Sequence, residues 1–259
     1  MRLPLYQVDA FTSRVFGGNP AGVVPLDSWL PDAVMQKIAA ENNQAETAFF
    51  VREGDGYRLR WFTPTVEVDL CGHATLASAY VLFAARGYAG AKIEFMTRSG
   101  RLAVTRQGDT LSLELPARPP KESAAIPDLA AALGKAPTQV LDSFAYLAVF
   151  EQEADLRALT PVMERIAKLD RVAVIVTAPG ESCDFVSRFF APQIGIPEDP
   201  VTGAAHCTLT PYWSKRLGKK GLQARQISAR VGELSCEDRG ERVIVAGKAV
   251  LYLEGTIHV

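Results

Sequence analysis

The second half of the chain repeats short motifs of its first half in the same order. The matching segments keep a nearly constant separation: Val34–Ala39 with Val162–Ala167, Arg60–Pro64 with Arg188–Pro192, Gly72 with Gly203, and Gly108–Leu113 with Gly240–Val245. Matches that stay in register over several elements indicate a repeated architecture rather than chance similarity. The sequence therefore predicts a duplicated domain, which restricts the chain to folds built from two similar halves.

The predicted boundary between the halves lies in Pro116–Ser123, where closely spaced prolines interrupt regular structure. We expect one repeat domain over residues 1–117 and a second over residues 118–249. The last residues, 250–259, are candidates for completing the first domain.

Each half contains one long apolar helical segment that begins at a glycine, Gly72–Arg86 and Gly203–Leu217. The first segment is apolar nearly all round, which is typical of a buried helix. A shorter helix is expected earlier in each half, over residues 32–41 and 161–168. Alternating segments between glycine turns predict further strands: Lys92–Thr97, Arg101–Arg106, Thr110–Leu115, Ala224–Ala229, Glu233–Glu237, Arg242–Ala246 and Ala249–Leu253. The predicted fold is α+β, with two pseudosymmetric domains, each a mostly antiparallel, barrel-like sheet around a central helix.

Composition excludes several classes of protein. The chain has 259 residues, 48% hydrophobic and 22% charged, which is ordinary for a globular protein with two cores. Its net charge is −1 and its Lys and Arg residues are scattered, which argues against a nucleic-acid partner. No apolar run is long enough to cross a membrane, so we expect a cytoplasmic protein. The four cysteines lack the spacing of a disulfide framework or a zinc site.

The glycines that begin the long helices mark candidate binding sites for an anion. Asp69–Thr75 and Glu198–Cys207 each place an acid shortly before a glycine and an apolar helical run. The first N–H groups of a helix have no partner within the helix, and the helix dipole favours negative charge there. Gly72, Thr202, Gly203 and Ala204 are therefore candidates for binding a carboxylate.

Chemistry in a duplicated protein is expected where the two copies differ. Glu46 corresponds to Arg171 in the second half, and His73 corresponds to Ala204. Glu46 lies at the entry to an apolar strand, where partial burial would make a carboxyl group usable as an acid and a base. The alternative is a solvated acid at a strand end. His73 lies in the first turn of a helix, whose dipole favours a neutral imidazole, and a hydrogen-bonded structural histidine is the alternative.

Three further residues have more than one interpretation. Asp199 could be a second acid or base, a group that holds a substrate, or a helix N-cap. Asn19 belongs to the loop Phe16–Gly22, which is rich in turn-forming residues and could bring backbone N–H groups to a ligand. Cys71 precedes a helix N-terminus, which can acidify a thiol, although the second half has no thiol at the paired position.

Five ordered motifs resemble the phenazine biosynthesis PhzF-like family: Val8–Phe11, Gly17–Val23, Asn43–Phe49, Cys71–Thr75 and Glu198–Gly203. The resemblance covers nearly the whole chain. It implies the diaminopimelate epimerase-like fold, with two pseudosymmetric domains and an active site in the interdomain cleft.

By this resemblance, Glu46 matches the acid/base that moves a proton between carbons of an unsaturated cyclic amino acid, with no cofactor and no metal. His73 and Asp199 match residues that hold and polarise the substrate, and the helix starts at Gly72 and Gly203 would bind its carboxylate. One departure is Ala204, because many members have serine after Thr-Gly. That difference predicts a different ligand from that of the phenazine enzyme.

The sequence thus predicts a cofactor-independent isomerase that moves a proton on a small carboxylic acid, either an amino acid or a cyclic unsaturated acid. Two alternatives remain at this point: an epimerase or racemase that uses Cys71, and a non-catalytic metabolite-binding protein with the same fold. The expected partner is a small-molecule substrate. A homodimer would follow the commonest symmetry of soluble oligomers, although no apolar stripe in the sequence specifies it.

Overall fold

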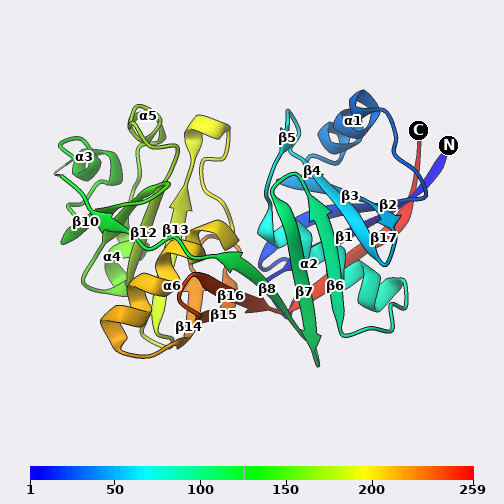
Figure 1. Cartoon of the computed structure of the whole chain (residues 1–259). Helices are drawn as coiled ribbons and strands as arrows, with labels where there is room; N and C mark the ends of the chain where they lie inside the picture. The colour runs from blue at the N-terminus through cyan, green and yellow to red at the C-terminus, as the bar shows by residue number, and fades with distance from the viewer. Residues whose placement is uncertain (125) are drawn as a thin grey trace. The chain divides into compact units, whose positions relative to one another are not determined.

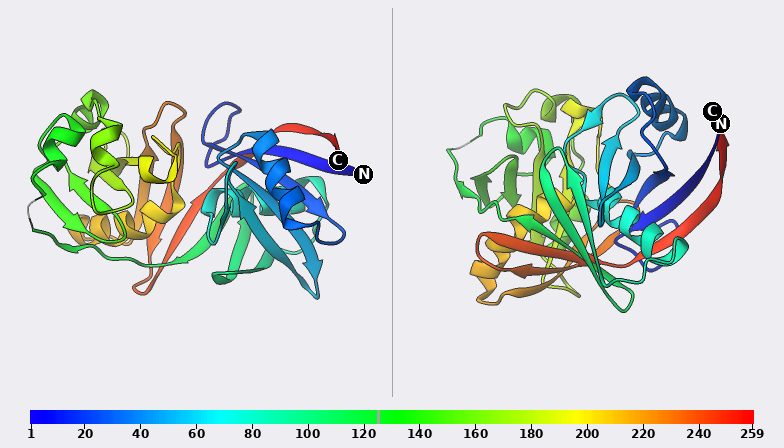
Figure 2. Two further views of the ribbon diagram at one scale, coloured as in Figure 1. Left: turned by 90° about the horizontal axis from the view of Figure 1, so that it is seen from above. Right: turned by 45° about the vertical axis from the view of Figure 1, so that its right-hand side comes forward.

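The computed structural model describes residues 1–124 and 126–259, which divide into two compact units (Figure 1). The first unit comprises Met1–Glu114 and Ala246–Val259, and the second comprises Leu115–Val245. The sequence placed these boundaries at residues 117 and 249, a few residues away. The C-terminal strand runs beside the N-terminal strand in the first unit, so the two chain ends are neighbours, as Figure 2 shows from two further directions.

The strands of the first unit surround a buried helix. They are β1 (Arg2–Ala10), β2 (Asn19–Leu26), β3 (Glu46–Glu53), β4 (Gly56–Phe62), β5 (Glu67–Val68), β6 (Lys92–Thr97), β7 (Gly100–Gln107), β8 (Thr110–Pro116) and β17 (Ala249–His258). The helices are α1 (Asp32–Asn42), the buried α2 (Gly72–Tyr80) and its π-helical continuation η1 (Val81–Ala85). Every residue of α2 from His73 to Ala79 is buried, and the helix packs against β1, β2 and β3.

The second unit has the same plan. Its strands are β9 (Lys121–Glu122), β10 (Gln139–Asp142), β11 (Tyr146–Val149), β12 (Val174–Pro179), β13 (Phe185–Phe190), β14 (Gly221–Gln226), β15 (Gly232–Asp238) and β16 (Arg242–Gly247). Its helices are α3 (Leu129–Leu133), α4 (Glu153–Ala158), α5 (Met163–Ile166), the 3₁₀ turn η2 (Pro192–Ile194) and the largely buried α6 (Gly203–Leu217).

The same order of parallel and antiparallel strand pairs occurs within each unit. In the first, β2–β3 is parallel, β3–β4 antiparallel, β4–β6 parallel and β6–β7 antiparallel. In the second, β11–β12, β12–β13, β13–β14 and β14–β15 follow the same alternation. The pairings β1–β17, β1–β2, β9–β10, β10–β11, β4–β5 and β7–β8 are antiparallel. The predicted α+β fold of two duplicated, mostly antiparallel domains around central helices is thus confirmed.

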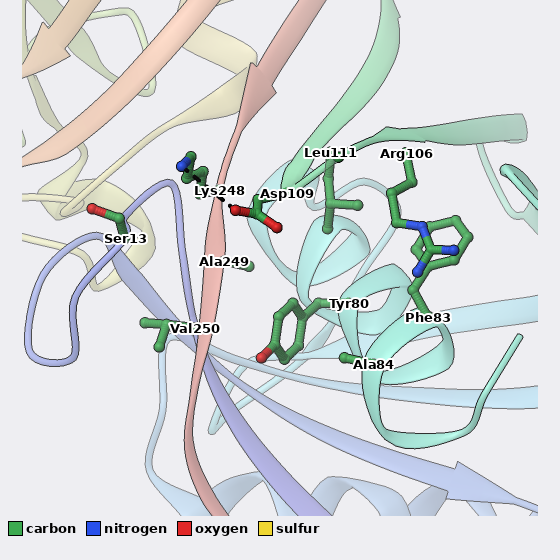
Figure 3. Close-up of a pocket in the computed structure, with 11 residues that line it drawn as sticks. Ser13, Tyr80, Phe83, Ala84, Arg106, Asp109, Leu111, Lys248, Ala249 and Val250 are labelled. Carbon is green, nitrogen blue, oxygen red and sulfur yellow. Dashed lines mark ion pairs between the residues drawn. The ribbon is translucent and has the colours of Figure 1, made fainter.

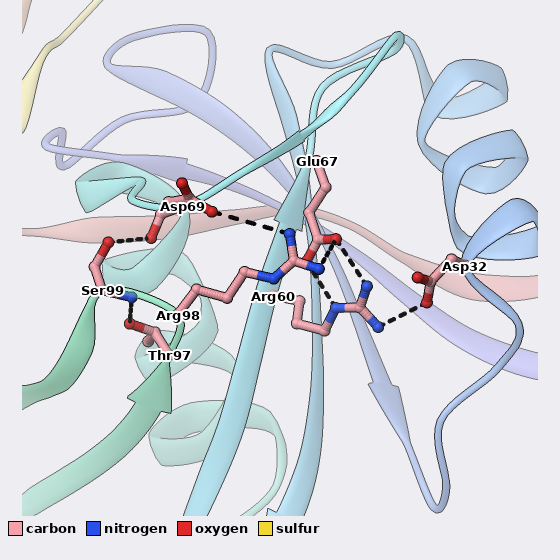
Figure 4. Close-up of polar contacts among 7 residues, drawn as sticks. All are labelled: Asp32, Arg60, Glu67, Asp69, Thr97, Arg98 and Ser99. Atoms are coloured by element: carbon pink, nitrogen blue, oxygen red, sulfur yellow. Dashed lines mark hydrogen bonds and ion pairs between the residues drawn. The ribbon is translucent and has the colours of Figure 1, made fainter.

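One arginine in each unit holds the segment that leads into the central helix. Arg60 of β4 donates to both carboxylate oxygens of Glu67 at 2.7 and 2.8 Å, and also to Asp32 of α1 (Figure 4). Arg188 of β13 donates to both carboxylate oxygens of Glu198 at 2.8 and 2.9 Å. The two glutamates stand the same number of residues before the glycine that opens their helix. Since bidentate pairs of this kind fix geometry as well as charge, both helix starts are held in the same way.

Several predicted elements differ from those observed. The helix predicted over 161–168 is reduced to α5, because the Val162 N–H donates to the Ala132 carbonyl and leaves the helix to begin at Met163. The helix predicted over Gly72–Arg86 changes to a π-helical turn after Tyr80. The elements β10, β11, α3 and α4 were not predicted. No helix within the described residues is both long and apolar enough to span a membrane.

Candidate active site

Glu46 is the first residue of β3 and is 9% exposed. The chain reaches this position through Asn43, whose left-handed backbone ends α1 and whose N–H donates to the Ala39 carbonyl. The apolar residues Ala48, Phe49 and Phe50 that follow are buried. Because this apolar run fixes the strand in the core, the carboxylate of Glu46 is held at the strand's buried end instead of in solvent.

His73 lies in the first turn of α2, directly after Cys71 and Gly72. Cys71 occupies the N-cap position with an extended backbone, and its carbonyl accepts a hydrogen bond from the Thr75 hydroxyl at 2.5 Å. No side chain caps the helix. The His73 residue is 5% exposed, so the imidazole is enclosed at the N-terminal end of the helix.

Three residues contact the two ring nitrogens of His73. Its Nε2 lies 3.2 Å from Glu46 Oε2. Its Nδ1 lies 3.2 Å from the amide Nδ2 of Asn19 and 3.5 Å from Sγ of Cys71. Residues from β2, β3 and α2 therefore meet at one buried histidine, and three predicted site residues, Asn19, Glu46 and His73, lie in one cluster.

Asn19 enters this cluster through a tightly constrained loop. Phe11 and Phe16 adopt positive φ angles of 62° and 69°, and the Phe16 N–H donates to the Asp9 carboxylate at 2.8 Å. Gly18 has φ +59°, and a Cβ built there would lie 2.0 Å from the Ala10 carbonyl oxygen. The structure shows that this loop delivers the fully buried Asn19 side chain to His73. That the loop also brings backbone N–H groups to a ligand stays a prediction.

The electrostatics of the cluster correct two expectations. Burial is the largest effect on the pKa of His73 and lowers it, yet attraction to Cys71 and Glu46 outweighs burial and raises the pKa well above 6.5. Burial raises the pKa of the Cys71 thiol to about 11. The thiol is therefore neutral near pH 7, and the Glu46 carboxylate is the charge that favours the imidazolium. These directions differ from the neutral imidazole expected for His73, and they go against the alternative in which the helix N-terminus acidifies Cys71. The reason is that the helix dipole was weighed without the facing carboxylate and without complete burial.

Glu46, Cys71 and His73 also offer ligand atoms that all lie within 4.8 Å of one another. These are donor types that zinc accepts. However, Glu46 faces Nε2 of the imidazole whereas Cys71 faces Nδ1. A metal ion binds one imidazole nitrogen, so an ion at either nitrogen would have only one of the two remaining ligands on its side of the ring. The arrangement fits proton transfer better than a three-ligand metal site.

The second unit holds the other predicted site residues at the start of α6. Thr202 is the N-cap residue, and its hydroxyl donates to Oδ2 of Asp199 at 2.5 Å. Asp199 is thus not the N-cap, which removes one of its three interpretations. No side chain caps α6, and Gly203 and Ala204 form its first turn. Asp199 and Thr202 are each 8% exposed.

Gln226 is a buried residue of this region that the sequence analysis missed. Its Oε1 accepts from the Thr202 N–H at 2.8 Å, and its Nε2 donates to the Asp199 carbonyl at 2.7 Å and to the Thr202 hydroxyl at 3.1 Å. Gln226 is fully buried and ends β14, whose alternate residues Leu222 and Ala224 also face inward. A glutamine at an inward position of an alternating strand was the signal that could have identified it.

His206 lies one turn into α6 and has the structural environment expected from the sequence. It is fully buried, and its Nδ1 lies 2.8 Å from the Thr202 carbonyl oxygen. Burial lowers the pKa of its imidazole to about 4. His206 is therefore neutral near pH 7, in contrast to His73.

The chain is similar to known proteins over its whole length. The sequence model of the phenazine biosynthesis-like protein family, PhzC-PhzF, matches residues 8–255. An uncharacterized isomerase of Pseudomonas aeruginosa is 53% identical over 259 residues, which cover 100% of both chains. The crystal structure of a PhzF-family protein of Enterococcus faecalis is 47% identical, covers 100% of both chains and superposes with a TM-score of 0.98.

A more distant structure supports the fold alone. A predicted epimerase of Pseudomonas aeruginosa is 19% identical, with a TM-score of 0.76 over 99% of each chain. The diaminopimelate epimerase-like fold implied by the sequence resemblance is therefore confirmed. Isomerase is the enzyme class named for the near curated relatives, as that resemblance also implied. The chain belongs to the phenazine biosynthesis-like PhzC-PhzF family.

Proposed function

We propose that this protein is a cofactor-independent isomerase that moves a proton between carbons of a small carboxylic acid, either an amino acid or a cyclic unsaturated acid. The observation that carries the proposal is the buried carboxylate of Glu46, 3.2 Å from the Nε2 of an equally buried His73. A buried acid next to an imidazole is suited to accepting and returning a proton.

In the proposed reaction, the Glu46 carboxylate removes a proton from one carbon of the substrate. The C–H electron pair moves into the conjugated system of the substrate, and Glu46 returns the proton to a second carbon. The His73 imidazolium stabilises the carboxylate when it is charged. Because the same group removes and returns the proton, one base is sufficient for a 1,3-shift.

The substrate carboxylate needs a binding site that stabilises negative charge. We propose the uncapped start of α2 at Gly72 and the uncapped start of α6 at Gly203 and Ala204 for this role. Thr202, whose N–H donates to Gln226 and whose hydroxyl donates to Asp199, is proposed to position that helix start. Asp199 is proposed to hold or polarise the substrate. Ala204 has only a methyl group, so we propose a substrate that needs no side-chain hydrogen bond there.

The rival reaction is epimerisation with Cys71 as a base. A thiol with a pKa raised to about 11 is a poor base near neutral pH, and this favours Glu46. The second alternative is not an enzyme but a metabolite-binding protein without catalytic activity. A bound ligand that is neither isomerised nor exchanges hydrogen with solvent would favour this second rival.

The proposal is tested by incubating the wild-type protein in heavy water with a panel of amino and unsaturated carboxylic acids. NMR detects an isomerised product, mass spectrometry detects deuterium incorporated at carbon, and thermal unfolding detects binding. We expect at least one acid that stabilises the protein and is isomerised, with deuterium gained where the proton on Glu46 exchanges with solvent before it is returned. If acids stabilise the protein and none is isomerised or gains deuterium, the isomerase proposal is wrong and the binding protein is favoured.

A further inference from the structure

A cavity of about 390 Å³ lies in the first unit, lined mainly by residues of α2, η1, β7, β8 and β17. This volume falls within the range of small-molecule binding sites. Tyr80 and Phe83 contribute aromatic rings to its lining, Leu111 and Val250 contribute aliphatic side chains, and Arg106 contributes a charge. All of these residues are distinct from those that contact His73.

The Arg106 guanidinium is already positioned for a ligand. It lies over the Phe83 ring, 4.5 Å from the ring centroid, at one side of the cavity (Figure 3). Among residues 1–124 and 126–259, no carboxylate lies within ion-pair distance of it. The contact with Phe83 restricts the side chain, and a guanidinium offers paired donors that match a carboxylate. Arg106 is thus a half-buried, pre-oriented cation that faces a cavity without an anionic partner.

The other two charged side chains at the cavity have opposite signs and lie near each other. Lys248 Nζ lies 3.8 Å from Asp109 Oδ2, and both side chains are largely exposed. Figure 3 shows this pair apart from Arg106, with Tyr80 and Leu111 in the same lining. The pair compensates its own charge, so Arg106 gives the cavity a single net positive charge next to apolar walls.

The backbone that forms one wall is also unusual. Phe83 and Ala84 belong to η1, a five-residue π-helical turn that directly continues α2. π-helical turns are rare and occur frequently at functional sites. Here the turn places Phe83 under Arg106, so the irregular backbone and the unpaired charge are parts of the same wall.

We propose that this cavity is a second binding site, for a small organic acid with one carboxylate and an apolar body of about the size of a ring. The carboxylate pairs with Arg106, and the body packs against Tyr80, Leu111 and Val250. The site is separate from the cluster at His73 and does not depend on the function proposed for it.

The test uses phenylacetate as the probe and its uncharged analogue phenylacetamide as the ligand control, with the full chain observed by amide NMR. We expect phenylacetate to shift the amide signals of Tyr80, Phe83, Ala84 and Leu111 saturably. Phenylacetamide should bind about tenfold more weakly or worse, because it loses the charged hydrogen bonds. Absence of saturable shifts at these amides, or equal binding of the two compounds, overturns the proposal.

Variants locate the binding site. Arg106→Met should weaken phenylacetate binding at these amides by about tenfold or more. Arg101→Met on the same strand is the matched control, since Arg101 is exposed and pairs with Glu94, and it should leave binding unchanged. Arg106→Lys keeps the charge without the paired donors and should bind with intermediate affinity, which answers the question even if Arg106→Met folds poorly. Unchanged binding in both Arg106 variants would also overturn the proposal.

Discussion

Glu46 Oε2 lies 3.2 Å from His73 Nε2, yet the two atoms are not aligned as hydrogen-bond donor and acceptor. Within the described residues neither atom has a hydrogen-bond partner, although both are buried. Buried polar atoms in proteins are nearly always paired, and exceptions occur at functional sites. The pair therefore combines a strong electrostatic interaction with hydrogen-bonding capacity that a substrate could use.

The charge of Glu46 should be visible in the titration of His73. The chain has three histidines, so their ring proton signals can be assigned with single variants and followed by NMR. We expect His73 to titrate above 6.5, and Glu46→Gln to lower its pKa because the neutral amide no longer attracts the imidazolium. A wild-type His73 that titrates at or below 6.5 would contradict the electrostatic account of the site.

His206 should make the protein sensitive to acid. Its pKa is about 4 in the folded state and near 6.5 in the unfolded state. Between these pH values the unfolded chain binds a proton at this histidine and the folded chain does not. The contribution of His206 to the free energy of unfolding is therefore complete above pH 6.5 and is lost as the pH decreases toward 4. The loss amounts to about 3 kcal/mol over this window.

Urea unfolding as a function of pH checks this prediction. His206→Gln should remove the part of the pH dependence between 6.5 and 4 that belongs to this histidine. His258→Gln, at an exposed position near the chain end, is the matched control and should retain it. Parallel pH profiles for wild type and His206→Gln would show that the buried imidazole is not the origin of the acid sensitivity.

Gly18 should be required for the loop that delivers Asn19. An alanine there has φ +59° and places its Cβ 2.0 Å from the Ala10 carbonyl oxygen. Gly54 has φ +60° with no atom within 4 Å, so Gly54→Ala isolates the backbone strain. We expect Gly54→Ala to cost about 1 kcal/mol, and Gly18→Ala to cost about 3 kcal/mol or more, because a steric clash adds to the strain. Equal free energies of unfolding for the two variants would refute the steric argument.

Gln226 should hold Asp199 and Thr202 in place. Gln226→Leu keeps a similar volume but removes three hydrogen bonds to that turn, so we expect a loss of about 2–4 kcal/mol in urea unfolding. Gln223→Leu on the same strand, at an exposed position, should cost less than about 1 kcal/mol. If both variants unfold alike, the buried network does not stabilise the turn.

The sequence predicted those helices and strands well whose own residues show an apolar pattern bounded by turn-forming residues. The helix predicted over Gly203–Leu217 and the strand predicted over Lys92–Thr97 have the bounds of α6 and β6. In both, an apolar pattern begins or ends at turn-forming residues. By contrast, β10 and β11 are short and are stabilised by pairing with neighbours, β11 in parallel with β12. Such elements depend on tertiary contacts that a local pattern does not contain.

The site was predictable in its residues but not in its contacts. Differences between the two halves singled out Glu46 and His73, and the structure brings them together. That Asn19 contacts the same imidazole depends on β2 pairing with β3 beside α2, which no single motif reveals. The same limit explains why the imidazole of His73 and the thiol of Cys71 differ from what the helix dipole alone indicates, since their pKa values are set by burial and by Glu46, which is distant in sequence. The catalytic roles of these residues stay predictions.

The most direct test of the central claim measures the rate of isomerisation by three proteins with the substrate that the panel identifies, and records deuterium incorporation in heavy water alongside. Wild type and Cys71→Ser should isomerise the substrate at similar rates. Glu46→Gln should be slower by about 100-fold or more, as expected when a general base is removed, while its thermal unfolding shows that it is folded. If Glu46→Gln isomerises the substrate at the wild-type rate, or if Cys71→Ser abolishes isomerisation while the effect of Glu46→Gln is mild, Glu46 is not the group that carries the proton.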